Sequence, residues 1–153
     1  MVREVTSKNA AKQTFMPLMR EFVRAYQAFS IYSADGFRLS GGKLTMPQGD
    51  VIFTLGNTEG MTFTEIGEKT LITKGTLTGV IDRLVLKKLV KRRVDKSDRR
   101  KIIVSLTRKG ERLFESDFPR QVMWMKEKFK KLSKKDRDAA MKAMIQIRQL
   151  FED

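Results

Sequence analysis

The stretch 62–106 constrains the fold most, because two short capped helices are followed there by two alternating strands. Thr62 is followed three residues later by Glu65, which is the capping-box spacing and predicts a short helix over Phe63–Thr70. Thr73 can cap a second helix that reaches about Lys88. Two helices joined by a turn of about three residues form a helix-turn-helix.

The helix that begins at Thr73 has two different faces. Helical spacing of apolar residues predicts a buried face made of Leu77, Val80, Ile81 and Leu84. The opposite face holds Gly75, Thr76, Thr78, Gly79, Asp82 and Arg83. These residues are small or hydrogen-bonding, which suits the close approach of a nucleic-acid duplex.

Two β-branched, alternating segments follow, Leu89–Val94 and Lys101–Leu106, and the polar segment 95–100 lies between them. This pattern predicts a β-hairpin with a basic tip. A helix-turn-helix followed by such a hairpin is the order of a winged helix-turn-helix. In that arrangement the second helix enters the major groove, and the hairpin reaches the phosphates or the adjoining minor groove.

The charge distribution favours the same partner. The 153 residues carry a formal net charge of +14, and segment 74–112 alone has 14 basic and 4 acidic side chains. Such a concentrated field attracts a polyanion, so double-stranded DNA is the expected partner. The chain has no Cys and no His, which excludes zinc sites, disulfides and cysteine or serine-triad enzymes, and we expect no metal and no cofactor.

Amphipathic helices flank the winged segment. On the N-terminal side a stripe over Lys8–Ser33 predicts a helix, and we expect Gly36, Gly41 and Gly42 to end it. Its apolar residues are Phe15, Leu18, Phe22, Tyr26 and Phe29. Thr45 with Pro47 then predicts a helix that runs to about Leu55 and ends in the turn 57–60.

On the C-terminal side Thr107 is expected to cap a helix that bends or restarts at Pro119. Ser133 opens a last helix with Met141, Met144, Ile147 and Phe151 on one stripe. The terminal stripes lie outside the winged part, and they predict a homodimer. We therefore expect one mainly α chain, 1–153, with an α+β winged helix-turn-helix over 44–110 and a helical dimerisation region over 8–35 and 112–153.

The sequence resembles the MarR family of transcriptional regulators, most specifically over Leu44–Gly110. The matching strings are Leu44-Thr45-x-x-Gln48, Ile72-Thr73-Lys74-Gly75-Thr76-Leu77-Thr78, Asp82-Arg83-Leu84, Leu89-Val90-x-Arg92, Asp98-x-Arg100 and Leu106-Thr107-x-x-Gly110. The resemblance implies a homodimer that binds pseudo-palindromic promoter DNA and represses until a ligand or an oxidant releases it. It also implies that Arg100 enters the minor groove, where Asp98 would hold it by a salt bridge.

Two features depart from the family pattern. Lys88 stands where the family usually has Gly, after the recognition helix, where a left-handed backbone favours Gly. Either Lys88 is present for a phosphate contact, or the turn differs. The missing Cys excludes the peroxide sensing that one branch of the family carries out through a cysteine.

The expected DNA-binding residues are Thr73, Lys74, Gly75, Thr76, Thr78, Gly79, Arg83, Lys96, Asp98, Arg99 and Arg100. For Arg83, a structural pairing with Asp82 or with a neighbouring helix is an open alternative. The aromatic residues of the flanking helices, with Trp124, Met125 and Phe129, form either a dimer interface or core, or a pocket for a small aromatic or anionic effector.

We therefore expect a sequence-specific transcriptional regulator that acts as a repressor. The alternative is an architectural DNA-binding protein without sequence preference. An enzyme is not expected, because no Gly-rich phosphate loop or companion base accompanies the carboxylates. Residues 1–13 lack a secretion-signal pattern and no apolar run could span a membrane, so we expect a cytoplasmic protein with no membrane partner.

Overall fold

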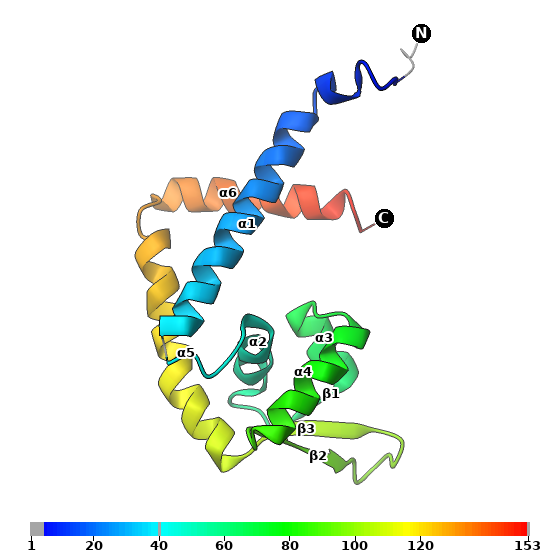
Figure 1. Cartoon of the computed structure of the whole chain (residues 1–153), viewed down its shortest axis with the longest axis vertical. Helices are drawn as coiled ribbons and strands as arrows, with labels where there is room; N and C mark the ends of the chain where they lie inside the picture. Colours follow the sequence, from blue (N-terminus) through cyan, green and yellow to red (C-terminus); the bar gives the residue numbers. More distant parts are fainter. Residues whose placement is uncertain (1–4, 40, 153) are drawn as a thin grey trace.

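The computed structural model describes residues 5–39 and 41–152 and shows a mainly helical chain with one small sheet (Figure 1). Over these residues the elements are, in order, η1 (Ala10–Lys12), α1 (Met16–Leu39), α2 (Met46–Leu55), β1 (Met61–Thr62), α3 (Phe63–Thr70), α4 (Lys74–Leu86), β2 (Val90–Val94), β3 (Ile102–Leu106), α5 (Arg108–Phe129) and α6 (Lys134–Gln149). The sheet is antiparallel in the order β1-β3-β2. The expected fold class, a winged helix-turn-helix with flanking helices, is confirmed.

The elements of the winged part lie within about two residues of their predicted positions. The Thr62–Glu65 capping box is present, with the Thr62 hydroxyl accepting from the Glu65 backbone N–H at 3.2 Å. The hairpin pairs Val90 with Leu106 and Val94 with Ile102. Strand β1 was not predicted, because it has only two residues, one of which also caps α3.

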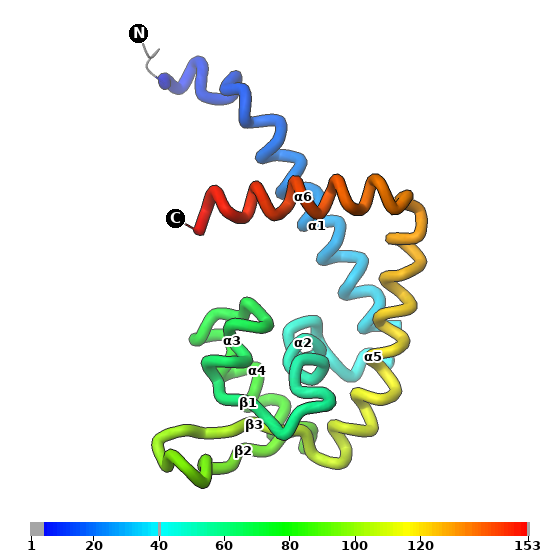
Figure 2. Tube along the Cα trace, turned by 180° about the vertical axis from the view of Figure 1, so that it is seen from behind, coloured from blue at the N-terminus to red at the C-terminus, as the bar shows by residue number. Residues whose placement is uncertain are grey.

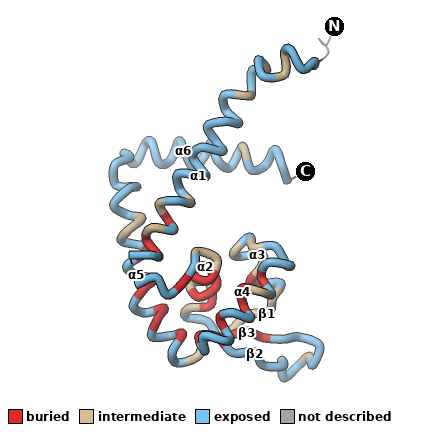
Figure 3. Tube along the Cα trace, viewed as in Figure 1, coloured by how far each residue is buried: buried red, intermediate tan, exposed pale blue. Residues whose placement is uncertain are grey.

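The core is formed where α2, α3 and α4 pack on the sheet and on the first half of α5 (Figure 3). The predicted buried face of α4 is confirmed, since Leu77, Val80, Ile81 and Leu84 are each at most 2% exposed. From α2, Val51, Ile52 and Leu55 join the same cluster. Burying such a side chain stabilises the fold by about 1.5–3 kcal/mol, so α4 is held firmly by its inner face.

The predicted bounds of the first helix were wrong at both ends. The helix begins at Met16, not near Lys8, because Pro17 in its first turn suits only a helix start. It then continues through Gly36 to Leu39, and the chain turns at Gly41 and Gly42, which both have positive φ. Gly36 is therefore an interior helix residue and not a terminator.

Gly36 allows α1 and α5 to approach closely. A Cβ at this position would lie 2.6 Å from both Gln121 Oε1 and Trp124 Cδ1 on α5. Nearby, Tyr32 and Trp124 stack with ring centroids 4.8 Å apart, and each side chain donates to the other residue's backbone carbonyl, at 2.9 and 3.1 Å. This contact joins the long N-terminal helix to the rest of the chain.

Helix α5 passes through Pro119 without interruption, so the expected restart does not occur. Figures 1 and 2 show the later half of α5 running in a different direction from the earlier half, in keeping with the expected bend. Proline lacks the N–H that would bond one turn back, which favours such a change of direction. The Thr107 and Ser133 caps of α5 and α6 are confirmed, since each hydroxyl accepts from the backbone N–H three residues later, at 3.1 Å.

Helix α6 turns at the end of α5 and runs in a direction that crosses that of α1 (Figure 2). None of its residues is buried, and the same holds for α1 before Ser33 (Figure 3). None of the helices described here is long and apolar enough to cross a membrane.

The turn after α4 has a left-handed backbone at Lys88, which has φ +58°. This geometry excludes the alternative of a different turn. We predict that Lys88→Gly raises the free energy of unfolding by about 0.5–1 kcal/mol, because glycine adopts positive φ without a Cβ clash. Thermal or urea unfolding measures the change.

Lys88→Ala is the matched control, because it removes the same charged side chain and keeps the Cβ. It should leave the free energy of unfolding close to that of the unmodified chain. If Lys88→Gly proves no more stable than Lys88→Ala, the backbone is not strained at this residue.

Candidate nucleic-acid interface

The outward face of α4 is open to solvent along its first two turns. Thr73, Lys74, Gly75, Thr76 and Thr78 are all exposed, and Gly79 is half-buried. Because the opposite face of the helix is buried in the core, these residues point outward, as the sequence predicts. Apart from its chain neighbours and the backbone of its own helix, no described atom lies within 4 Å of the position that a Gly75 Cβ would occupy, so this part of the helix surface is bare.

Local hydrogen bonds order the polar groups on this face. The Thr73 hydroxyl donates to the Thr76 hydroxyl at 3.1 Å, and the Thr78 hydroxyl donates to the Lys74 carbonyl at 3.4 Å. Arg83 is exposed, and its guanidinium nitrogens lie 3.8 and 3.9 Å from where a Gly79 Cβ would be. Gly79 therefore leaves room for Arg83 to lie along the helix.

The expected alternative that Arg83 pairs with Asp82 was wrong. Among the residues that the structure describes, the ion-pair partner of Asp82 is Arg92 on strand β2, at 2.5 Å. The Arg92 guanidinium also lies over the Phe63 ring, 5.3 Å from its centroid. Arg92 thus contacts both α4 and the start of α3, and it holds the base of the wing against the helix-turn-helix.

The sequence pattern indicates no role for Arg92. It formed part of the Leu89-Val90-x-Arg92 string, but its partners lie about 10 and 30 residues away in the chain. Only its place in an alternating strand beside α4 could have suggested this contact.

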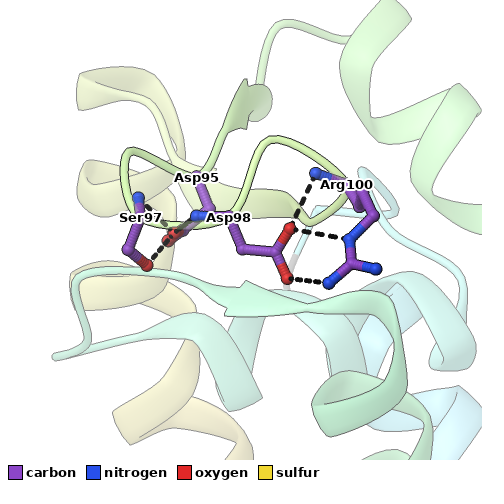
Figure 4. A network of polar contacts seen from close by, with 4 residues as sticks. All are labelled: Asp95, Ser97, Asp98 and Arg100. Carbon is purple, nitrogen blue, oxygen red and sulfur yellow. Dashed lines mark hydrogen bonds and ion pairs between the residues drawn. The ribbon is translucent and has the colours of Figure 1, made fainter.

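The wing tip is ordered by two carboxylates. Asp95 Oδ1 accepts from the Ser97 hydroxyl at 2.5 Å and from the backbone N–H groups of Ser97 and Asp98 at 2.8 and 2.9 Å (Figure 4). These bonds favour the charged form and lower the pKa of Asp95 to about 2, with the Ser97 hydroxyl as the largest cause. The turn is therefore built around an ionised carboxylate.

The expected salt bridge between Asp98 and Arg100 is present. Asp98 Oδ1 accepts from the Arg100 Nε and backbone N–H, both at 3.1 Å (Figure 4). The bond to the Arg100 side chain lowers the pKa of Asp98. The Arg100 side chain is still 90% exposed, so its guanidinium is oriented by Asp98 and remains accessible. Lys96 and Arg99 are exposed beside it.

A groove of about 580 Å³ separates the wing from α3. Arg100 and Lys101 border it on the wing side, and Glu65 and Glu68 border it on the α3 side. Lys101 contributes to lowering the pKa of Glu65, after the larger effect of the hydrogen bonds from Thr62. Glu65 therefore partly balances the charge of Lys101, whereas Lys96, Arg99 and Arg100 are exposed to solvent. No group of side chains able to hold a metal ion occurs in the described ranges.

We predict that the carboxyl of Asp95 titrates with a midpoint of about 2, against a usual value of 3.8. Because its folded pKa is lowered, the ionised form stabilises the turn above pH 4, and this stabilisation is lost as the pH falls towards 2. Ser97→Ala should raise the Asp95 pKa towards its usual value. Carboxyl carbon chemical shifts followed against pH by NMR measure both midpoints.

Ser116→Ala is the control, since it removes another serine hydroxyl that donates to a neighbouring carboxylate, far from the wing. It should leave the Asp95 midpoint unchanged. An Asp95 midpoint near 4 in the unmodified chain would show that the turn lacks these bonds in solution.

The winged part of the chain is similar to known proteins. Residues 44–102 match the model of the MarR family. The HTH-type transcriptional regulator TtmR of Methylorubrum extorquens is 35% identical over 89 residues, a match that spans 58% of this chain and 41% of that relative.

Solved structures share the fold over most of the chain. BpsR of Bordetella bronchiseptica is 28% identical with a TM-score of 0.71, over 86% of this chain and 98% of that one. MepR of S. aureus, at 20% identity, has a TM-score of 0.75 over 92% of this chain and 99% of that one. The matched segment forms the helix-turn-helix and most of the wing in the expected order, and this part of the chain is similar to the MarR family of transcriptional regulators.

Proposed function

We propose that the protein binds a pseudo-palindromic promoter site as a homodimer and represses transcription there. Each α4 would enter a major groove with the residues of its exposed face, and each Arg100 would enter the adjoining minor groove. The observation that carries this proposal is the pairing of a bare, polar α4 face with an exposed Arg100 that Asp98 already orients. The solved structure of MepR is that of a DNA complex, which supports the same use of the shared fold.

The case for a homodimer rests on apolar surface that the single chain leaves uncovered. Large apolar side chains in or directly beside α1, the end of α5 and α6 are 40% or more exposed, and they include Phe15, Leu18, Phe22, Phe29, Phe129, Met141, Met144 and Phe151. Soluble monomers rarely expose so much contiguous apolar surface. A two-fold symmetric contact would bury both sets of stripes against each other.

Helix α6 also needs such a partner on energetic grounds. It has 16 residues, none of them buried, and an isolated helix of this length is only marginally stable in water. A second copy of the chain would supply the missing packing surface. Dimerisation would also fix the distance between the two α4 helices, which must match half-sites about 10 base pairs apart.

We further propose that a small-molecule effector controls repression and that the protein acts in the cytoplasm, where promoter DNA is found. Support comes from BpsR, whose DNA binding is regulated by 6-hydroxynicotinic acid. The expected aromatic residues Phe15, Phe22, Tyr26 and Phe29 are solvent-exposed in the single chain, which favours the dimer-interface alternative over a core role for them.

Arg100→Ala should weaken operator binding and flatten its salt dependence by about one phosphate-equivalent per subunit. It should also reduce any preference for A·T-rich flanks, because a narrow minor groove concentrates negative potential. Fluorescence anisotropy titrations at several salt concentrations, on operators with A·T or G·C flanks, measure all three effects.

Arg38→Ala is the matched control, since Arg38 is also exposed and paired with a nearby aspartate, Asp35, but lies at the end of α1. It should leave the salt dependence of operator binding unchanged. If Arg100→Ala and Arg38→Ala show the same salt dependence, the wing does not contact DNA. If the unmodified protein binds operator and competitor DNA equally well, the architectural alternative is correct instead.

The full chain should sediment as a dimer at micromolar concentration. Met144→Glu should shift it towards the monomer, because it places a charge on the apolar stripe of α6. Lys142→Glu, on the same helix, changes the charge by more and should leave the dimer intact. Analytical ultracentrifugation measures the masses, and circular dichroism checks that both variants are folded. A monomeric unmodified chain would contradict the two-fold arrangement.

A further inference from the structure

A cavity of about 470 Å³ lies at the end of α4 that is remote from Lys74. It is bordered by the loop before α2, the turn after α4 and the first turns of α5. Ligand pockets in proteins commonly have volumes of about 300–1,000 Å³, so it has room for a small organic molecule. Because α4 has 13 residues, this cavity is about 20 Å along the helix from Lys74 and the proposed groove-binding end.

The cavity lining is strongly and uniformly cationic. Lys43, Lys87, Lys109 and Arg112 line it, and no carboxylate does. In the described part of the chain none of these four forms an ion pair, whereas Arg92, Arg100 and Arg38 each have an aspartate. Four like charges around one hollow repel each other, and a bound anion would relieve that repulsion.

Several donors remain available to an anion. The Lys87 ammonium donates to the Lys43 carbonyl at 2.7 Å and to Gln48 Oε1 at 2.8 Å, and the Lys109 ammonium donates to the Lys87 carbonyl at 2.9 Å. An ammonium group has three donors, so one remains on Lys87 and two on Lys109. The guanidinium of Arg112 adds a planar fork that matches the oxygens of a phosphate.

Two further features refine the ligand class. Leu89 and Leu113 also line the cavity, so part of a ligand would lie on an apolar surface. The cavity also adjoins the N-terminus of the 22-residue helix α5, where the helix dipole favours negative charge. A doubly charged phosphate group with an organic body satisfies the cations and the apolar lining together better than a free ion does.

We propose that this cavity is a binding site for a small phosphorylated organic molecule. The residues that line the cavity also contact α4. Lys87 is the C-cap of α4 and its ammonium bonds to Gln48 on α2, while the Lys109 ammonium on α5 bonds to the Lys87 carbonyl. A phosphate bound by the remaining donors of these two ammonium groups draws them towards itself and changes how the end of α4 is held. On the proposed function of the protein, the site is therefore regulatory for DNA binding.

Phenyl phosphate is the probe, with inorganic phosphate, phenol and sodium chloride at equal ionic strength as comparisons. Isothermal titration and thermal unfolding of the full chain without DNA test the site itself. Phenyl phosphate should bind more tightly than inorganic phosphate and should raise the melting temperature, whereas phenol and sodium chloride should not. Arg112→Ala, which breaks no hydrogen bond or ion pair described here, should weaken phenyl phosphate binding about tenfold.

Lys134→Ala/Lys135→Ala is the control, because it removes two exposed cations from the start of α6 and should leave binding unchanged. Operator titrations with and without phenyl phosphate then test regulation separately from binding, and their result does not depend on the first measurement. An altered operator affinity that Arg112→Ala abolishes supports the regulatory role.

The binding proposal is overturned if phenyl phosphate binds no better than inorganic phosphate, or equally well to Arg112→Ala. It is also overturned if Arg112→Ala lowers the salt slope of operator binding while phenyl phosphate does not bind, since the cations would then contact DNA. Binding without any effect on operator affinity overturns the regulatory part alone. Failure of the unmodified protein to bind any operator contradicts the proposed function and leaves the binding result standing.

Discussion

The interface that the rest of the structure depends on is the packing of the inner face of α4 against α2 and the sheet. Leu77, Ile81 and Leu84 are almost completely buried there. Because a helix has only one such stripe, burying it also determines which residues point outward. The polar residues of α4 are exposed as a consequence of that packing, and no separate interaction is needed to present them.

The sheet and the Arg92 contacts fix the orientation of the wing relative to α4. Strand β3 lies between β1 and β2, so the hairpin is part of the core sheet, and its orientation does not depend on its turn alone. Arg92 adds a polar link from β2 to Asp82 on α4 and a contact with Phe63. These side chains are partly exposed, so the pair contributes little to stability, and its main effect is on orientation. The base of the wing is thereby fixed, while its tip depends on Asp95 and Asp98.

The helices outside the winged part are packed against the rest of the chain over only part of their length. The Tyr32–Trp124 contact and the close approach at Gly36 join α1 to α5 within one chain. Beyond this junction the apolar stripes of α1 and α6 are uncovered. The chain therefore has two parts. The winged part has a hydrophobic core of its own, whereas the apolar faces of the flanking helices are not buried in a single copy. In the proposed dimer, the winged part would contact DNA, and the helices outside it would set the distance between the two DNA-contacting surfaces.

The sequence by itself determined the elements whose signals are local. The capping residues Thr62 and Thr107 bond to backbone groups three residues away, and the apolar stripe of α4 repeats within one helix, so the winged order and the exposed face of α4 could be read directly. Thr73 precedes α4 as predicted, but its hydroxyl bonds to Thr76 and makes no capping bond. The Asp98–Arg100 bridge, two residues apart, was expected from a family resemblance and is also local. Local rules failed at Gly36, because a glycine that permits a close helix contact cannot be told from a glycine that ends a helix.

Only the tertiary structure decided which distant residues meet. Asp82 has two arginines within 10 residues, and the packing of β2 beside α4 brings Arg92 to it in place of its neighbour Arg83. The two-residue strand β1 exists only because β3 offers it an edge. The four cations of the cavity beside α4 come from segments up to about 70 residues apart, and no spacing in the sequence brings them together. Such contacts depend on the way in which the elements pack, and the packing is a property of the whole chain and not of any one segment.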